Sequence, residues 1–341
     1  MKFRTEVNLE NSEQKILLTD RVFSVGSCFA AEMSEKLQDG QMQTLCNPFG
    51  TLFNPYSLNT AIKNLHDCKI YKNEDLILYN EEYISLNHHS SFNSNYAHKT
   101  LEKINQNIET GNQFLQKTNW VLITYGTSYI YEFLPKNQLV ANCHKIPQKF
   151  FKKRFLTTEE LHHSIAETIE LLKDICENDV QILFTVSPVR HTKDGMVENQ
   201  WSKSKLICAI QEILPNFENC HYLPIYEILM DDLRDYRFYK EDLIHPNNQA
   251  IQYIWEKFGD AYFSDEVKNF INENYKIKAS LEHRPNDDNS PKHKEFLEKL
   301  QEKIKIQQSK VKGAVNANQK TRENRVRKAS ENKHHNIQRN F

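Results

Sequence analysis

Apolar runs alternate with amphipathic stretches through most of the chain. Residues 21–25, 120–125 and 180–186 are rich in apolar, β-branched and aromatic side chains, which is typical of buried strands. Residues 161–176 carry apolar side chains at helical spacing, and a further helix is predicted over 202–214. Apolar strands that alternate with helices predict an α/β protein whose parallel sheet is covered on both faces.

Turn and capping residues mark the ends of further elements. A helical segment at 30–37 stops before Gly40, a common C-terminal signal. A strand-like run at 220–225 is followed by His245-Pro246, which is predicted to open a helix that continues through Phe258.

Two inserts interrupt this alternation. Residues 70–98 predict a β-hairpin that leads to His88 and His89, and residues 129–146 predict a second hairpin around residues 135–138. We expect these hairpins to form a lid or a wall beside the site.

The composition changes at Arg284. A linker is predicted at 285–291, followed by a charged helix, and the segment beyond Gly313 has too little apolar surface to offset the entropy of ordering. The predicted organisation is a main domain at 20–260, a C-terminal helical extension at 261–283, and a linker, charged helix and disordered basic tail at 284–341.

Charge is spread unevenly along the chain. The formal net charge is −1, but residues 312–341 hold eight Lys/Arg and two Asp/Glu, which leaves about −7 for the rest. A mildly acidic body argues against nucleic acid as the main partner. The basic tail leaves open a contact with RNA or an acidic membrane, and a solvated extension is the simpler interpretation.

Cysteine usage and the N-terminal segment indicate the compartment. The seven cysteines form no CxxC pair, which argues against zinc and disulfide frameworks and favours reduced thiols. The first residues lack the apolar stretch of a signal peptide, and no apolar run reaches the roughly 20 residues of a membrane helix. We expect a cytoplasmic protein without a membrane span, a metal or a cofactor.

The segment from Gly26 to Ala30 (Gly-Ser-Cys-Phe-Ala) joins the first predicted strand to the first predicted helix. This turn places two nucleophiles, Ser27 and Cys28, at the positive end of a helix, where negative charge is stabilised. The alternative is a turn in which Ser27 or Cys28 only caps the helix.

Residues at three strand ends are predicted to converge. Gly26, Gly126 and Ser187 each follow a predicted strand, and ligand sites of parallel sheets lie beyond the carboxyl ends of the strands. We therefore expect these residues on one edge of the sheet.

Asp242 and His245 form a second candidate constellation. At this spacing a carboxylate can hold the imidazole Nδ1–H and leave Nε2 free as a base. The alternative is an aspartate helix cap with a histidine beside it.

The chain resembles the GSCFA family, which is grouped with the SGNH/GDSL hydrolases. The family's name-giving motif matches residues 26–30, and its other segments resemble residues 47–51, 186–191 and 194–199 in the same order. The resemblance covers about residues 20–260 and is specific for the family rather than for an activity.

The resemblance implies a three-layer α/β/α fold of the flavodoxin-like type and acyl-ester chemistry. SGNH enzymes use a serine in a Gly-Asp-Ser turn after the first strand, and a DxxH pair supplies the base and its orienting carboxylate. Asp242 and His245 match that pair. By the same resemblance, N–H groups at Gly26 and Gly50 are the candidates that hold the oxyanion.

The nucleophile differs from the family pattern of SGNH enzymes. Gly-Asp-Ser-Leu laid over residues 26–29 puts Cys28 at the nucleophile position, whereas a shift of one residue restores Ser27. Register favours Cys28, and the prevalence of serine among related enzymes favours Ser27. Both remain candidates.

The third motif of the superfamily is also altered. The segment Gly126-Thr127-Ser128 lacks the asparagine that lends an oxyanion donor. The hydroxyl groups of Thr127 and Ser128, or the amide of Asn54, are the candidate replacements.

Histidine and arginine side chains complete the set of binding candidates. Arg190 and His191 follow a strand end and are predicted either to hold an anionic substrate group or to be a surface pair. Adjacent side chains of an extended segment point to opposite sides, so at most one of His88 and His89 faces the site. We take His89 as that candidate and expect no metal role.

These features predict an SGNH-like acyl esterase or acyltransferase that acts on small-molecule or glycan esters. Acylated carbohydrates are the expected substrate class on resemblance alone. The alternative is a non-catalytic module that retains the fold and binds a carbohydrate or a protein, an interpretation that the missing asparagine favours.

Overall fold

The computed structural model describes residues 4–282, 291–292 and 295–311. Within these residues the chain forms two compact units. The larger unit comprises the residues up to Glu13 with 21–38 and 43–262, and the smaller unit comprises 14–20, 39–42 and the residues from Phe263 onward.

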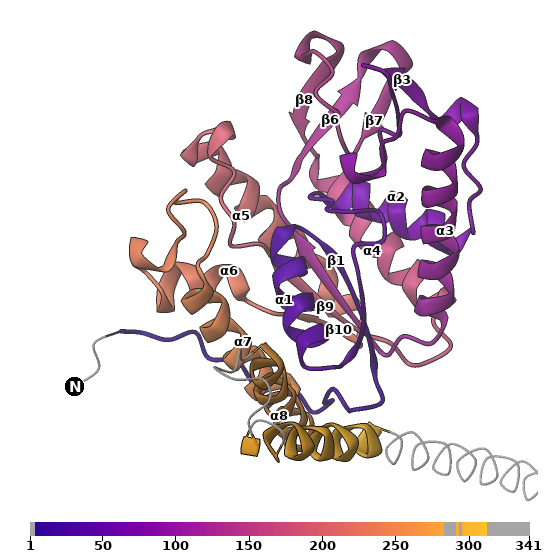
Figure 1. The fold of residues 1–341 in the computed structure, drawn as a ribbon. Helices are drawn as coiled ribbons and strands as arrows, with labels where there is room; N and C mark the ends of the chain where they lie inside the picture. Colours follow the sequence, from indigo (N-terminus) through magenta and orange to yellow (C-terminus); the bar gives the residue numbers. More distant parts are fainter. Residues whose placement is uncertain (1–3, 283–290, 293–294, 312–341) are drawn as a thin grey trace, which may run out of the picture. The chain divides into compact units, whose positions relative to one another are not determined.

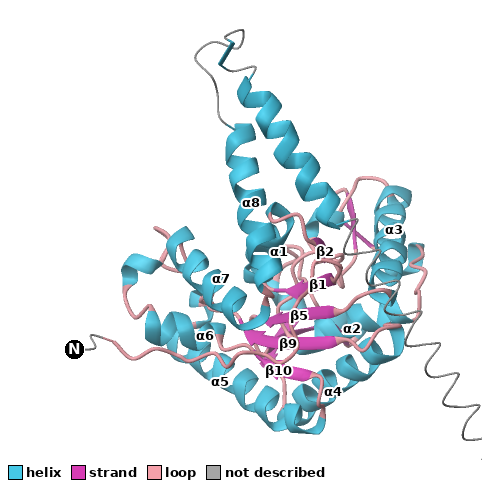
Figure 2. Cartoon of the chain, turned by 90° about the horizontal axis from the view of Figure 1, so that it is seen from below, coloured by secondary structure: helices cyan, strands magenta, loops and turns pink. Residues whose placement is uncertain are grey.

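The larger unit is built on a sheet of five parallel strands (Figure 2). Their spatial order is β10-β9-β5-β1-β2, which is 2-1-3-4-5 when the strands are numbered along the chain, the order of flavodoxin-like folds. The strands are β1 (Arg21–Gly26), β2 (Gln43–Cys46), β5 (Trp120–Tyr125), β9 (Gln181–Val186) and β10 (Cys220–Tyr222). The predicted α/β class with a parallel sheet is confirmed.

Helices cover both faces of this sheet because successive strand residues point to opposite sides. Val25 and Ile123 belong to an apolar core with α2 (Pro55–His66), α3 (Ala97–Gln116), α4 (Thr158–Ile175) and α5 (Met196–Ile213). On the other face the ring of Trp120 meets Tyr262 edge-on at 6.0 Å, and Ser24 Oγ lies 3.4 Å from Ala30 O. That face therefore carries α1 (Cys28–Asp39) and α7 (Asn248–Tyr262).

Two helices begin at other residues than predicted. The helix expected from residue 202 begins at Met196, directly after Gly195, whose φ of +100° ends the preceding turn. The helix expected to open at Pro246 begins at Asn248, because Asn247 Oδ1 accepts the Ala250 N–H at 3.0 Å and caps the first turn.

Both predicted hairpins are present and lie together at one end of the larger unit (Figure 1). β3 (Ile77–Tyr79) pairs with β4 (Glu82–Ile84), and β6 (Tyr129–Phe133) pairs with β7 (Gln138–Val140). A separate apolar cluster that includes Ile84 and Phe133 joins the two inserts. A further strand, β8 (Phe151–Phe155), pairs with β6 and was not predicted, since three of its five residues are charged.

The smaller unit contains α8 (Asp265–Glu282) and a helical segment at 295–311, which falls in the predicted charged helix. Gln307 Nε2 donates to Phe270 O at 3.4 Å and joins these two segments. Of the linker predicted at 285–291, residues 285–290 lie outside the described residues, as does the predicted tail beyond Gly313. None of the helices in the described part of the chain has the length and apolarity needed to cross a membrane.

Replacing Gly26 by alanine is expected to destabilise the larger unit severely. A Cβ at this position would lie 2.1 Å from Thr124 O, and the φ of +134° is one that side chains rarely adopt. Strain and backbone overlap together should lower the free energy of unfolding by about 3 kcal/mol or more, measured by urea denaturation. As a control, Gly126→Ala should lower the free energy of unfolding by less, because a Cβ at Gly126 would have its tightest contact, at 3.1 Å, with the Phe53 side chain. Equal losses in the two variants would contradict this account of the turn.

Candidate active site

The candidate site lies at the carboxyl edge of the parallel sheet. The strand order reverses between β1 and β5, and open α/β sheets bind ligands at such a switch point. Gly26 ends β1, Gly126 follows β5 and Ser187 follows β9. The structure thus brings the three predicted strand ends to one edge.

The turn after β1 is held by three hydrogen bonds, two between backbone groups and one to a side chain. The Gly26 N–H donates to Asn47 Oδ1 at 2.8 Å, and the Ser27 N–H donates to Thr124 O at 3.0 Å. The Leu52 N–H donates to Gly26 O at 3.2 Å. These contacts fix the direction in which α1 leaves the sheet.

Ser27 and Cys28 differ sharply in burial. The Ser27 side chain is only 1% exposed, and its Oγ accepts the Phe29 N–H at 3.3 Å, so it caps α1. Cys28 is the first residue of α1 and is partly exposed. Of the two predicted nucleophiles, Cys28 is therefore the one that a ligand can reach.

The environment of Cys28 favours the neutral thiol. Burial raises the pKa of the Cys28 thiol above its usual range, and Glu32 acts in the same direction. The Cys28 backbone N–H and the Lys240 ammonium group lower that pKa without offsetting the effect of burial. At neutral pH the sulfur therefore requires a base before it can act as a nucleophile.

Asp242 and His245 form the predicted pair. His245 Nδ1 lies 2.7 Å from Asp242 Oδ2, and the backbone N–H groups of His245 and Ile244 donate to Asp242 Oδ1 at 3.0 and 2.8 Å. These hydrogen bonds hold the pKa of Asp242 well below its usual range. Among the residues that the structure describes, none is hydrogen-bonded to His245 Nε2. The pair is thus arranged as an orienting carboxylate and an imidazole with a free nitrogen.

Hydrogen bonds and an ion pair connect the Asp242–His245 loop with its neighbours. The Lys240 N–H donates to His245 O at 2.7 Å, and Lys240 Nζ pairs with Glu32 of α1 at 3.2 Å. The Arg190 N–H donates to Ile244 O at 3.2 Å. The loop is therefore tied to α1 and to the segment that follows β9.

His191 lies beside the end of β5. Its Nε2 is 3.3 Å from the place that a Cβ on Gly126 would take, and its ring meets Phe53 edge-on at 5.7 Å. Burial lowers the pKa of His191 to about 4, and the positive charge of Lys203 acts in the same direction. His191 is therefore neutral at pH 7, so its imidazole can bind a ligand through hydrogen bonds but not through charge.

The two amides predicted to hold the oxyanion are engaged within the protein, since the Gly26 N–H donates to Asn47 Oδ1 and the Gly50 N–H to a backbone carbonyl. Two further amides beside them also donate to a carbonyl. The Gly50 N–H donates to Asn47 O at 2.8 Å. The N–H groups of Gly126 and Thr127 both donate to Phe53 O, at 2.7 and 3.0 Å. In this arrangement these amides serve their own turns.

Of the predicted side-chain donors, Asn54 differs from the two hydroxyl residues. The hydroxyl groups of Thr127 and Ser128 lie 2.9 and 3.2 Å from Ser202 Oγ and are buried with it. Asn54 Oδ1 accepts the Ser57 N–H at 2.8 Å and caps α2. Within the described ranges its Nδ2 donates to no residue, and Asn54 as a whole is only 6% exposed.

The two adjacent histidines differ in burial. His88 is fully buried, its ring packs at 4.9 Å from those of Phe49 and Tyr71, and burial lowers its pKa to about 3. His89 is partly exposed, and its Cβ lies 2.2 Å from where a Cβ on Gly50 would be. In the described part of the chain, no group of three His, Cys, Asp or Glu side chains is arranged to hold a metal ion.

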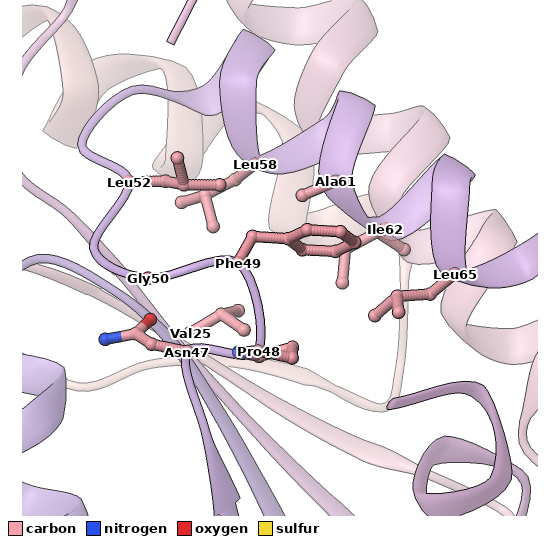
Figure 3. Close-up of a pocket in the computed structure, with 10 residues that line it drawn as sticks. All are labelled: Val25, Asn47, Pro48, Phe49, Gly50, Leu52, Leu58, Ala61, Ile62 and Leu65. Atoms are coloured by element: carbon pink, nitrogen blue, oxygen red, sulfur yellow. The ribbon is translucent and has the colours of Figure 1, made fainter. Parts of the chain in front are cut away.

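An apolar cavity underlies the loop between β2 and α2. Figure 3 shows the Phe49 ring extending toward Ala61 and Ile62, whereas the Asn47 amide points to the other side. The cavity holds about 10 Å³, room for a single water. It is therefore interior packing that supports the loop rather than a pocket for an acyl chain.

Lys203 is a residue of the site that sequence reasoning missed. It is fully buried in α5, and its Nζ donates to Gly126 O at 2.6 Å and to Ser187 O at 2.7 Å. It thereby joins the segments that follow β5 and β9. Helical spacing was the available signal, because Lys203 falls on the same stripe as the buried Leu206 and Ile210.

The fold and the site define the class of protein, a parallel α/β fold with polar residues at its switch point. Residues 21–258 match the GSCFA family, and residues 275–328 match the GSCFA domain protein, C-terminal domain. The chain belongs to the GSCFA family. A search of curated proteins found no match.

One similar solved structure is the crystal structure of a DUF4886 family protein from Bacteroides uniformis. It is 10% identical, the match covers 82% of this chain and 92% of that one, and the TM-score is 0.40.

The buried Lys203 should make stability depend on pH. Burial lowers its pKa from 10.5 to about 7, so between these values the unfolded chain binds more protons and stability rises with pH. Between pH 7 and pH 9 the free energy of unfolding should rise by about 2 kcal/mol more in the wild type than in Lys203→Met, measured by urea denaturation. Lys205→Met, on the same helix, should follow the wild type. If the free energy of unfolding changes with pH in the same way in the wild type and in Lys203→Met, then Lys203 does not titrate in this range.

Proposed function

We propose that this protein is an acyl esterase or acyltransferase of the SGNH type, in which Cys28 is the nucleophile. The observation that carries the proposal is the 2.7 Å contact between His245 Nδ1 and Asp242 Oδ2 on a loop tied to α1. That pairing is what a general base requires: a fixed tautomer and a free Nε2. Cys28, at the start of α1, is the accessible nucleophile of the turn.

The first half of the reaction forms a thioester. His245 Nε2 takes the proton of the Cys28 thiol while Sγ bonds to the ester carbonyl carbon. The tetrahedral intermediate then collapses, its C–O bond breaks, and the departing alkoxide takes the proton from His245. The raised pKa of the Cys28 thiol fits this route, because the proton leaves only when a base and a substrate are both in place.

The second half restores the thiol. A water or an acceptor alcohol gives a proton to His245 as its oxygen bonds to the thioester carbonyl carbon. The C–S bond breaks, the sulfur recovers the proton, and a carboxylic acid or a new ester is released. Throughout, the Asp242 carboxylate stabilises the imidazolium ion without accepting its proton.

Two groups are suited to hold the oxyanion. The N-terminus of α1 carries partial positive charge beside Cys28. The Asn54 amide is held through its Oδ1, and its Nδ2 donates to no residue of the described ranges. A single donor of this kind contributes on the order of 3 kcal/mol of transition-state stabilisation.

The substrate class and the compartment are part of the proposal. Acylated carbohydrates are the proposed substrates on family resemblance alone. All seven cysteines are free, which supports a reducing compartment such as the cytoplasm.

A second candidate function is a non-catalytic module that binds a carbohydrate or a protein. The observation that favours it is the engagement of the Gly50, Gly126 and Thr127 amides by carbonyl groups. With those amides engaged, oxyanion stabilisation would depend on Asn54 and α1.

Turnover of p-nitrophenyl acetate is expected to depend on Cys28 and His245. Cys28→Ala and His245→Ala should both reduce multiple-turnover hydrolysis to background, because each removes a group that the chemistry requires. Cys208→Ala, which removes an exposed thiol elsewhere, should leave the rate unchanged. Only multiple turnovers are informative, since exposed thiols react once with activated esters.

Detection of a covalent intermediate on Cys28 distinguishes the enzyme from the binding module. Acid quenching during turnover should trap an acetyl thioester on the Cys28 peptide, detected by mass spectrometry and removed by hydroxylamine. If wild-type protein neither turns over nor accumulates acetyl on Cys28 above the level on Cys208, the binding module is the correct assignment.

A further inference from the structure

A pocket of about 140 Å³ lies beside the Asp242–His245 loop. Its floor is apolar, formed by Leu229, Met230 and Leu233 from the π-helical turn at 228–232 and the residue after it. Its polar lining consists of the side chains Arg190, Arg234, Asp235, Tyr236 and Tyr239. The volume suits a small polar group rather than a whole sugar or an acyl chain.

Arg190 is held over two aromatic rings in this pocket. Its guanidinium carbon lies 4.0 Å from the centroid of the Tyr239 ring and 5.2 Å from that of Tyr236. Cation–π contacts of this kind hold the side chain in place and leave the edge of the guanidinium group for other partners.

Among the described residues, no carboxylate pairs with Arg190. The neighbouring charges are compensated: Arg234 pairs with Asp231, and Arg237 lies 3.9 Å from Asp235. The polar partners of the Arg190 guanidinium are uncharged: it donates to Leu243 O at 3.5 Å and interacts with the Tyr239 hydroxyl. The pocket therefore carries one positive charge that its own residues leave unpaired.

The pocket is connected directly to the proposed base. The Arg190 N–H donates to Ile244 O at 3.2 Å, and its guanidinium group faces Leu243 O. Both carbonyls lie between Asp242 and His245 in the chain. An anion bound to Arg190 therefore belongs to a molecule that also lies beside the catalytic loop.

We propose that this pocket binds a carboxylate group of the substrate, so that the enzyme prefers esters that carry a carboxylate. The proposal rests on the proposed function, which it deepens by naming the substrate class. A planar monoanion matches the fork of one guanidinium group. A phosphate dianion fits less well, because Arg234 is already paired with Asp231.

The carboxylate has two possible sources in an ester, and binding separates them. D-Glucuronate represents a carboxylate on the alcohol part, and succinate represents one on the acyl part. We expect one of them to bind the full-length Cys28→Ala protein with a Kd in the millimolar range or below, measured by titration calorimetry, whereas D-glucose does not. Arg190→Gln in that background should weaken binding at least about tenfold.

Three further variants control for packing and for general charge. Arg190→Lys keeps the charge and should retain part of the affinity. Tyr236→Ala removes a side chain that is 64% exposed and should weaken binding without loss of folding. Lys193→Gln removes an exposed positive charge that follows Arg190 in the chain but does not line the pocket, and it should have no effect.

Kinetics supply the second measurement. With mono-4-nitrophenyl succinate or an O-acetylated glucuronate, Arg190→Gln should raise KM about tenfold at nearly unchanged kcat. With p-nitrophenyl acetate, which has no carboxylate, the effect of Arg190→Gln on KM should be much smaller than with the two charged esters.

The two measurements fail in different ways. Absence of turnover with all esters would contradict the proposed function, while binding to the Cys28→Ala protein would still decide the role of the pocket. The proposal of a carboxylate pocket is overturned if neither D-glucuronate nor succinate binds. It is also overturned if the Arg190→Gln variant binds the anion as tightly as the parent protein does.

Discussion

Gly26 brings the backbone at the end of β1 so close to β5 that a Cβ would lie 2.1 Å from Thr124 O. This approach lets the Ser27 N–H reach the same carbonyl oxygen and lets the Gly26 N–H reach Asn47 Oδ1. Ser27 is drawn into the interior, where it caps α1, and Cys28 is left at the accessible start of the helix. The position of the proposed nucleophile thus follows from one steric constraint.

Charge is distributed around the site in three different ways. Lys203 is buried and held by two carbonyl oxygens, and no carboxylate in the described part of the chain pairs with it, so it joins two segments of the site at a cost in desolvation. Asp242 is exposed and hydrogen-bonded to His245, so it orients that residue. Arg190 rests on aromatic rings and pairs with no carboxylate of the described residues, which suits it to a ligand. In the proposed function these three arrangements serve structure, catalysis and recognition respectively.

Much of the fold could be predicted because its elements are local. The strands at 120–125 and 180–186 are continuous apolar runs, and both hairpins have turn residues between apolar segments. β8 could not be predicted, because its lysines and arginine suit an exposed edge and its pairing with β6 depends on residues distant in sequence. The Asp242–His245 contact could be predicted because three residues separate its partners.

The sequence by itself determined the α/β class, the edge of the sheet where the strand ends meet and the short-range pairing of Asp242 with His245. Only the tertiary structure decided which of Ser27 and Cys28 is accessible, which amides remain available and where Lys203 places its charge. The reason is physical: periodicity and short spacings act within one element, whereas burial and hydrogen-bond partners depend on elements far apart in the chain. The Gly-Ser-Cys turn can therefore be recognised in the sequence, but packing decides that Ser27 caps the helix and that Cys28 stays accessible.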